Sequence, residues 1–109
     1  MSYRVAVAST DGKYVNEHFG RAQQFLIFEL SENGHQFIEL RKNQPSCHVE
    51  QSDESGHLQT VNLLADCKGV LVARIGPAAE QYLLEHGIKA FIIPDFIDEA
   101  LQKVKNHLD

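Results

Sequence analysis

The sequence predicts an α/β fold in which helices cover a mixed five-stranded sheet, and three observations lead to this prediction. The first half of the chain contains three strand patterns in succession, two of them separated by the hairpin signal Asn33-Gly34. The second half alternates helical and strand patterns, which is typical of parallel strands joined by crossover helices. Three of the five strand patterns lack the polar alternation of a half-exposed strand, as strands covered on both faces do.

The expected strands are short runs bounded by turn residues. Asn33 and Gly34 both tolerate the positive φ that a tight hairpin requires. The first strand lacks polar alternation and belongs at the centre, with the hairpin on one side and the fourth and fifth strands, parallel to it, on the other. The strand order is then 3-2-1-4-5. The strands are expected at residues 3–9, 25–30, 35–41, 69–73 and 89–93.

Three helices are expected, at residues 57–66, at residues 77–86 and after the capping residues Asp95 and Asp98. Pro77 suits the first position of the second helix, and Gly87 ends it. Each helix has one apolar face. These faces consist of Leu58, Val61, Leu64 and Ala65; of Ala79, Tyr82 and Leu83; and of Ile97, Ala100, Leu101, Val104 and Leu108.

The bulk composition indicates one folded domain over residues 1–109. With 43% hydrophobic and 23% charged residues, the chain resembles ordinary globular proteins. A net charge of −5 and the lack of a Lys/Arg cluster argue against a nucleic-acid partner. No apolar run approaches the roughly 20 residues of a membrane-spanning helix. We therefore expect a cytoplasmic protein without nucleic-acid or membrane partners.

The two cysteines have different settings. In a reducing cytoplasm, Cys47 and Cys67 are expected to remain thiols. Cys67 stands just before an apolar strand, where a small apolar side chain fits. Cys47 is followed by His48 in the long irregular segment 43–56, and loops of that length in small domains are usually mobile or functional.

The segment around His18 is the first candidate site. It follows the first strand in the run Glu-His-Phe-Gly, and imidazole is the side chain that most often binds metals in proteins. Lys13 and Arg21 in the same loop provide positive charge. The alternative is a surface histidine that hydrogen-bonds a turn.

Cys47 and His48 form a second candidate, with His57 ten residues after the cysteine. Thiolate and imidazole suit iron, iron–sulfur or zinc centres better than calcium or magnesium. A closed zinc site normally has closely paired Cys or His residues, which this segment lacks. A nucleophilic Cys47 needs only a base within reach, but no orienting third group is evident, so catalysis ranks below binding.

The turn at residues 74–79 is a third candidate. Gly76 lets a ligand approach the backbone, and a helix beginning at Pro77 directs free N–H groups toward an anion. This turn should lie at the same sheet edge as the His18 loop, where open α/β sheets bind ligands. A plain connector is the alternative.

Scattered carboxylates also leave a two-metal nuclease open, although sequence spacing cannot show whether these side chains converge on one site. They are Asp11, Glu29, Asp66 and Asp95.

Several runs, in order, resemble a known family. They are Val-Ala-Val-Ala-Ser-Thr-Asp-Gly from residue 5, Glu-His-Phe-Gly-Arg-Ala from 17, Phe-Leu-Ile-Phe-Glu from 25, Leu-Leu-Ala-Asp-Cys from 63, Ala-Arg-Ile-Gly-Pro from 73 and Leu-Leu-Glu-His-Gly-Ile from 83. Over residues 3–105 the chain resembles the dinitrogenase iron-molybdenum cofactor biosynthesis family. That group includes the nitrogenase accessory proteins NifX and NafY and the carboxy-terminal domain of NifB.

The resemblance implies a ribonuclease H-like α/β/α fold whose second strand is antiparallel to the rest. It implies a nitrogen-fixation accessory protein, not an enzyme, that binds the iron-molybdenum cofactor or an iron–sulfur precursor and passes it between donor and acceptor assembly proteins. The family's cluster-holding histidine falls on His18. Relatives often carry a cysteine where Cys47 stands, but its neighbours here depart from the family pattern.

The leading hypothesis is a carrier with His18, Arg21 and Gly76 at the cofactor and His18, Cys47 and His48 as metal ligands. Two alternatives stay open. One is a regulatory or scaffold domain that binds a partner protein or an anionic metabolite without metal. The other is a metal-dependent phosphoesterase.

Overall fold

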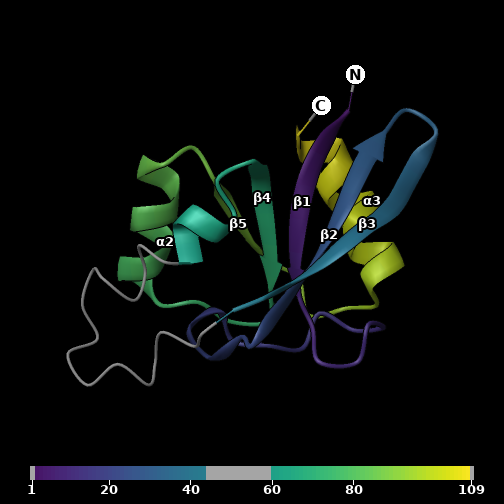
Figure 1. Ribbon diagram of the computed structural model, residues 1–109. Helices are drawn as coiled ribbons and strands as arrows, with labels where there is room; N and C mark the ends of the chain where they lie inside the picture. Colours follow the sequence, from purple (N-terminus) through teal and green to yellow (C-terminus); the bar gives the residue numbers. More distant parts are fainter. Residues whose placement is uncertain (1, 44–59, 109) are drawn as a thin grey trace.

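The five strands form one sheet with the order β3-β2-β1-β4-β5 in the computed structural model, which describes residues 2–43 and 60–108 (Figure 1). Strand β1 lies at the centre. It pairs in parallel with β4 and antiparallel with β2, and β2 pairs antiparallel with β3. The predicted order and the antiparallel second strand are therefore confirmed. The strands are β1 (Tyr3–Ala8), β2 (Gln24–Ser31), β3 (Gly34–Lys42), β4 (Cys67–Val72) and β5 (Lys89–Ile92).

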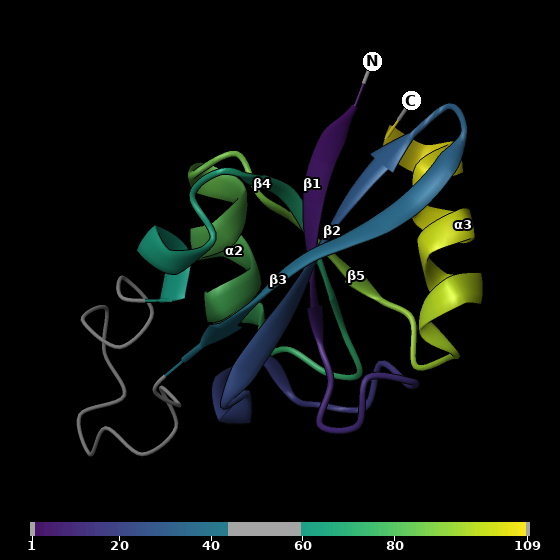
Figure 2. The same cartoon turned by 45° about the vertical axis from the view of Figure 1, so that its right-hand side comes forward.

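Helices cover both faces of this sheet (Figure 2). Helix α3 (Ile97–Leu108) packs on one face, and α2 (Pro77–Glu85) packs on the other together with the short helical stretch 60–63. Successive side chains of β1 point to opposite faces of the sheet, so they pack alternately against the two helical layers. Val5 and Val7 join the apolar cluster with α3, whereas Ala6 and Ala8 join the cluster with α2. Because both faces are buried, the central strand has no polar alternation.

The first expected helix ends earlier than predicted. Residues 60–63 are helical, 64–66 form a turn, and 57–59 lie outside the described residues. The turn closes with a hydrogen bond of 2.9 Å from Cys67 N–H to Leu64 O, after which Cys67 already pairs with β1. Val61 and Leu64 are buried as expected, but Ala65 is exposed because the helix has ended before it.

The edge strand β3 contains a bulge that the sequence pattern did not predict. Ile27 pairs with Glu39 but Phe28 pairs with Phe37, so Ile38 is the extra residue. Ile38 packs against the α2-side cluster, and Phe37 contacts Phe28 edge-on at 5.6 Å. A bulge redirects side chains along a strand in this way.

In the described part of the chain, no helix is long and apolar enough to cross a bilayer.

Candidate functional site

The His18 segment is fastened to the ends of two neighbouring strands. Glu17 N–H donates to the carbonyl of Ala8, the last residue of β1, at 3.3 Å. Beyond β4, Ala73 N–H donates to Glu17 O at 2.9 Å and Phe19 N–H donates to Arg74 O at 2.8 Å. His18 and Arg74 thus form an isolated parallel bridge. The prediction that the His18 loop and the residue-74 turn share one sheet edge is confirmed (Figure 1).

The His18 side chain caps a short 3-10 helix, η1 (Phe19–Arg21). Its Nδ1 accepts a hydrogen bond of 2.9 Å from Gly20 N–H. Phe19 is 1% exposed and lies against Phe25, so it anchors the turn in the core. The alternative role, a histidine that hydrogen-bonds a turn, is therefore observed, and this hydrogen bond uses one of the two ring nitrogens of the half-buried residue.

This hydrogen bond defines where the ring proton resides. An amide N–H can only donate, so Nδ1 of His18 must offer its lone pair to Gly20. In the neutral imidazole the proton then sits on Nε2. Toward a bound molecule, the ring in this tautomer presents an N–H donor.

The carboxylate of Asp11 orders the loop before His18 through hydrogen bonds to the backbone. Asp11 Oδ1 accepts from Lys13 N–H at 2.9 Å and from Tyr14 N–H at 3.0 Å. These two backbone hydrogen bonds are the main causes that lower the pKa of this carboxyl from its ordinary value. Gly12, with φ of 74°, provides the left-handed residue of the turn. Asp11 is therefore a turn-forming residue.

Two of the other scattered carboxylates are held apart from one another. Asp66 forms a two-point ion pair with Arg41, at 2.7 and 2.8 Å, and Asp95 binds Lys103 at 2.9 Å. Arg41 is the first cause that holds the pKa of Asp66 well below its usual range. Across residues 2–43 and 60–108, no three His, Cys, Asp or Glu side chains gather closely enough to hold a metal ion. These contacts do not support a two-metal nuclease.

Exposed cations flank His18. Arg21, the last residue of η1, and Arg74, its bridge partner, are both exposed, as is Lys13. Gly76 is the N-cap of α2, and a Cβ added to it would meet no described atom within 4 Å. The backbone at the start of α2 is therefore accessible.

The described ends of the segment that carries Cys47 and His48 meet beside η1. Thr60 Oγ1 donates to Asn43 Oδ1 at 3.2 Å, and the Asn43 side chain donates to Ala22 O at 2.8 Å. Ala22 is the residue that follows η1. Cys47 and His48 themselves lie outside the described residues. Sequence reasoning missed this Asn43–Thr60 junction, because it joins two polar residues that belong to no motif.

Cys67 is a buried thiol, as its position predicted. It is 4% exposed, and burial is the main cause that raises its pKa to about 12. Its Sγ lies 3.7 Å from Asp66 Oδ1. A thiol with a raised pKa is a poor nucleophile and a poor metal ligand at neutral pH, so Cys67 is not part of the site.

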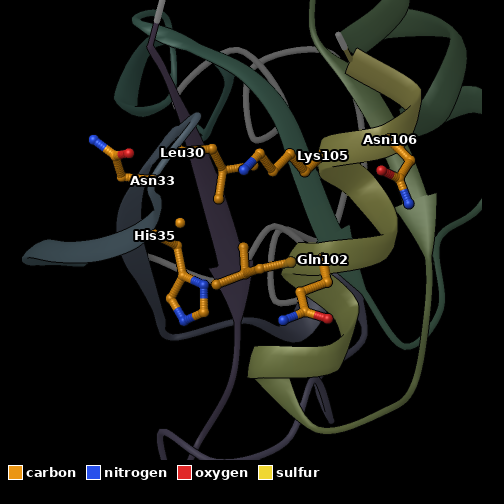
Figure 3. Close-up of a pocket in the computed structure, with 8 residues that line it drawn as sticks. Leu30, Asn33, His35, Gln102, Lys105 and Asn106 are labelled. Atoms are coloured by element: carbon orange, nitrogen blue, oxygen red, sulfur yellow. The ribbon is translucent and has the colours of Figure 1, made fainter.

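A cavity of about 510 Å³ lies at the opposite end of the sheet, between the β2–β3 turn and α3 (Figure 3). Its charged groups already have protein partners. Lys105 Nζ donates to Glu32 O at 3.0 Å, and His35 Nε2 lies 3.0 Å from Asp98 Oδ1. His18 lines neither this cavity nor one of about 430 Å³ at the start of α3. The cavity in Figure 3 is therefore separate from the candidate site.

Comparison with known proteins places the sequence in context. The family model described as "Dinitrogenase iron-molybdenum cofactor" matches residues 1–107. The FeMo cofactor biosynthesis protein NifB of Sinorhizobium fredii is 38% identical over 89 residues, which are 82% of this chain and 18% of that protein. Protein NifY of Azotobacter vinelandii is 31% identical over 87 residues, 80% of this chain and 34% of that protein. The chain thus spans about a fifth of NifB and a third of NifY.

Solved structures share the fold. The crystal structure of PH0822 has a TM-score of 0.71 at 22% identity and covers 95% of this chain and 91% of its own. The apo form of the orange protein from Desulfovibrio gigas has a TM-score of 0.66 at 18% identity, covering 95% and 88%. At these identities the likeness concerns the fold alone.

Proposed function

This chain belongs to the dinitrogenase iron-molybdenum cofactor family, and from that premise we propose that it binds an iron–sulfur or iron-molybdenum cofactor, or a precursor, in the cytoplasm. It passes this cargo between a donor and an acceptor assembly protein and carries out no catalytic step. The names of NifB and NifY relatives support cofactor biosynthesis as the setting. The observation that carries the proposal is the fixed position of His18 between the ends of β1 and β4.

Local charge favours such a cargo. Iron–sulfur clusters with thiolate ligands are anionic, and the whole chain has a net charge of −5, which opposes them. Arg21, three residues after His18, and Arg74, its bridge partner, are exposed, and we expect their positive charges to offset this repulsion where the cargo would lie. Gly76 adds accessible backbone at the same edge.

Cys47 and His48 are proposed as further contacts. Asn43 is hydrogen-bonded to Ala22 next to η1, and Cys47 follows Asn43 by only four positions in the sequence. A chain of four residues reaches at most about 14 Å. Sequence distance therefore supports a thiolate within reach of the His18 edge.

A partial ligand set suits a carrier. Within residues 2–43 and 60–108, no three candidate ligands gather around one point, so His18 belongs to no saturated metal site there. A cargo held by few protein groups can leave for an acceptor site that has more of them. A closed four-ligand cage would retain it instead.

Anaerobic reconstitution tests this proposal. The full chain is incubated with ferrous iron, sulfide and a reductant, desalted, and examined by visible absorption and electron paramagnetic resonance. Wild-type protein should retain a chromophore that His18→Ala loses to a large extent, while His86→Ala, an exposed histidine at the end of α2, retains it. Equal retention by His18→Ala would remove His18 from the site, and no retention by wild type would refute the carrier role.

The metal-free alternative has one supporting observation, the accessible backbone at Gly76 before α2. A regulatory domain of this kind would bind a phosphate-bearing metabolite there. Calorimetry with such metabolites distinguishes the two functions. Saturable heat that Gly76→Ala reduces would favour the alternative over the carrier.

A further inference from the structure

One ring nitrogen of His18 is already committed within the protein. Nδ1 lies 2.9 Å from the amide nitrogen of Gly20 and accepts its hydrogen. A metal ion cannot share that lone pair, so coordination through Nδ1 would break the cap of η1. Coordination through Nε2 requires the proton to move to Nδ1, where it would point at the N–H of Gly20.

The surrounding backbone opposes a simple reorientation of the ring. Phe19 N–H is bonded to Arg74 O at 2.8 Å, and Arg21 N–H is bonded to His18 O at 2.9 Å. The Phe19 side chain is buried in the core. These two hydrogen bonds hold the peptide group between His18 and Phe19, and the bond from Ala73 N–H to Glu17 O at 2.9 Å holds the preceding one. The Gly20 amide then fixes the ring within this turn.

We propose that His18 contacts the cargo as a hydrogen-bond donor through Nε2–H and not as a metal ligand, and that the Gly20 amide is the positioning group that sets this tautomer. This inference rests on the proposed function and specifies which chemical group of the cargo His18 recognises. The recognised group is an acceptor at the surface of the cluster, such as a bridging sulfide or a carboxylate oxygen. Hydrogen bonds to cluster sulfur are an established way for proteins to interact with such groups.

This mode of contact fits a transfer protein. No metal–nitrogen bond has to break when the cargo leaves, and no proton has to move within the ring. Exposed Arg21 and Arg74 provide the longer-range attraction, while the Nε2–H provides direction. Ligands from an acceptor protein could then replace the contacts one at a time.

Three substitutions separate donation from coordination. Asn at position 18 keeps an oxygen near the place of Nδ1, so it can accept from Gly20, but it has no donor that reaches as far as Nε2. Gln lacks the cap but carries an N–H near the place of Nε2. Donation predicts that His18→Gln retains a cluster assembled from ferrous iron and sulfide about tenfold better than His18→Asn or His18→Ala. Coordination predicts equal losses in all three, which would overturn the inference. His86→Gln is the matched control.

Magnetic resonance gives a readout that does not depend on affinity. In the cluster-loaded wild-type protein labelled with ¹⁵N-histidine, pulsed electron paramagnetic resonance should detect only the weak coupling of a hydrogen-bonded nitrogen. The strong coupling of a metal-bound nitrogen, lost in His18→Gln, would overturn the inference while leaving the carrier role intact.

Long-range ¹H–¹⁵N spectra of the unloaded protein should show the proton of the His18 ring on Nε2, and a proton on Nδ1 would also overturn the inference. A wild-type protein that retains no cluster refutes the proposed function instead.

Discussion

The amide of Gly20 and Nδ1 of His18 are joined by a hydrogen bond of 2.9 Å, so the histidine proposed to contact the cargo also caps a turn. A single substitution of His18 therefore changes two things at once. Replacing it with alanine removes the cap and the Nε2 nitrogen together. Stability measurements are needed to separate the two effects.

The cap predicts a measurable stability difference among variants of His18. His18→Ala should lower the free energy of unfolding by about 1 kcal/mol, because the Gly20 amide loses its acceptor in the side chain. His18→Asn should lose less than half of that, since its oxygen can accept the same hydrogen. Urea denaturation followed by circular dichroism measures both values. If Asn and Ala cost the same, the cap contributes nothing to folding.

The ion pair of Arg41 and Asp66 predicts a second stability effect. The guanidinium binds both carboxylate oxygens and donates to Leu63 O at 2.8 Å, which ties β3 to the turn before β4. Arg41→Ala should lower the free energy of unfolding by about 1 kcal/mol at pH 7, the upper part of the range for partly exposed pairs. Arg4→Ala is the control, because Arg4 contacts Asp66 through one nitrogen at 3.0 Å, and it should cost less than about 0.5 kcal/mol.

The same pair predicts a pH dependence with a definite sign. The pKa of Asp66 is lowered in the folded state, chiefly by Arg41, so the carboxylate stabilises the fold above its unfolded pKa of about 4. This contribution is lost as the pH falls below that value toward the folded-state pKa. The difference between wild type and Arg41→Ala should therefore stay constant from about pH 7 to pH 5 and shrink below about pH 4. A difference that grows on acidification would contradict the assignment.

The sequence was sufficient for the sheet because apolar continuity and turn residues are local properties. The strand order followed from an apolar first strand, a hairpin at Asn33-Gly34 and alternating helices, and it agrees with the observed sheet. The bulge at Ile38 could not be predicted, because it depends on which side chains of β3 pack against the apolar cluster on each face of the sheet. The end of the first helix was predicted at residue 66 and lies at residue 63, because the apolar pattern continues through Leu64 and Ala65 into the turn.

The site was only partly accessible to sequence reasoning. The common edge of His18 and Arg74 was predictable because parallel strands end on the same side of a sheet. The Gly20–His18 hydrogen bond was not, since the pattern of residue types does not specify which ring nitrogen faces an amide. The Asn43–Thr60 junction joins residues 17 apart and has no motif. The roles of Arg21, Gly76, Cys47 and His48 stay predictions.

Burial of Cys67 predicts that its thiol is unreactive in the native protein. With a pKa raised from 9.0 to about 12, the thiolate fraction at pH 8 is about a thousandfold lower than for an ordinary cysteine. In a Cys47→Ser background, a disulfide reagent that reports thiols by colour should react with Cys67 only after denaturant is added. Rapid reaction without denaturant would show that Cys67 is accessible and would return it to the set of candidate ligands.

Charge reversal beside His18 tests whether the local field governs cargo binding. Arg21→Glu or Arg74→Glu places a negative charge where an anionic cluster would approach, and each should weaken retention about fivefold to tenfold at low salt. The effect should diminish near physiological ionic strength, where the screening length is about 8 Å. Lys68→Glu is the matched control, because it changes the net charge equally but lies at the start of β4, at the far end of the sheet. If all three variants weaken binding alike, total charge and not the His18 edge controls the interaction, and the cargo would have to bind elsewhere.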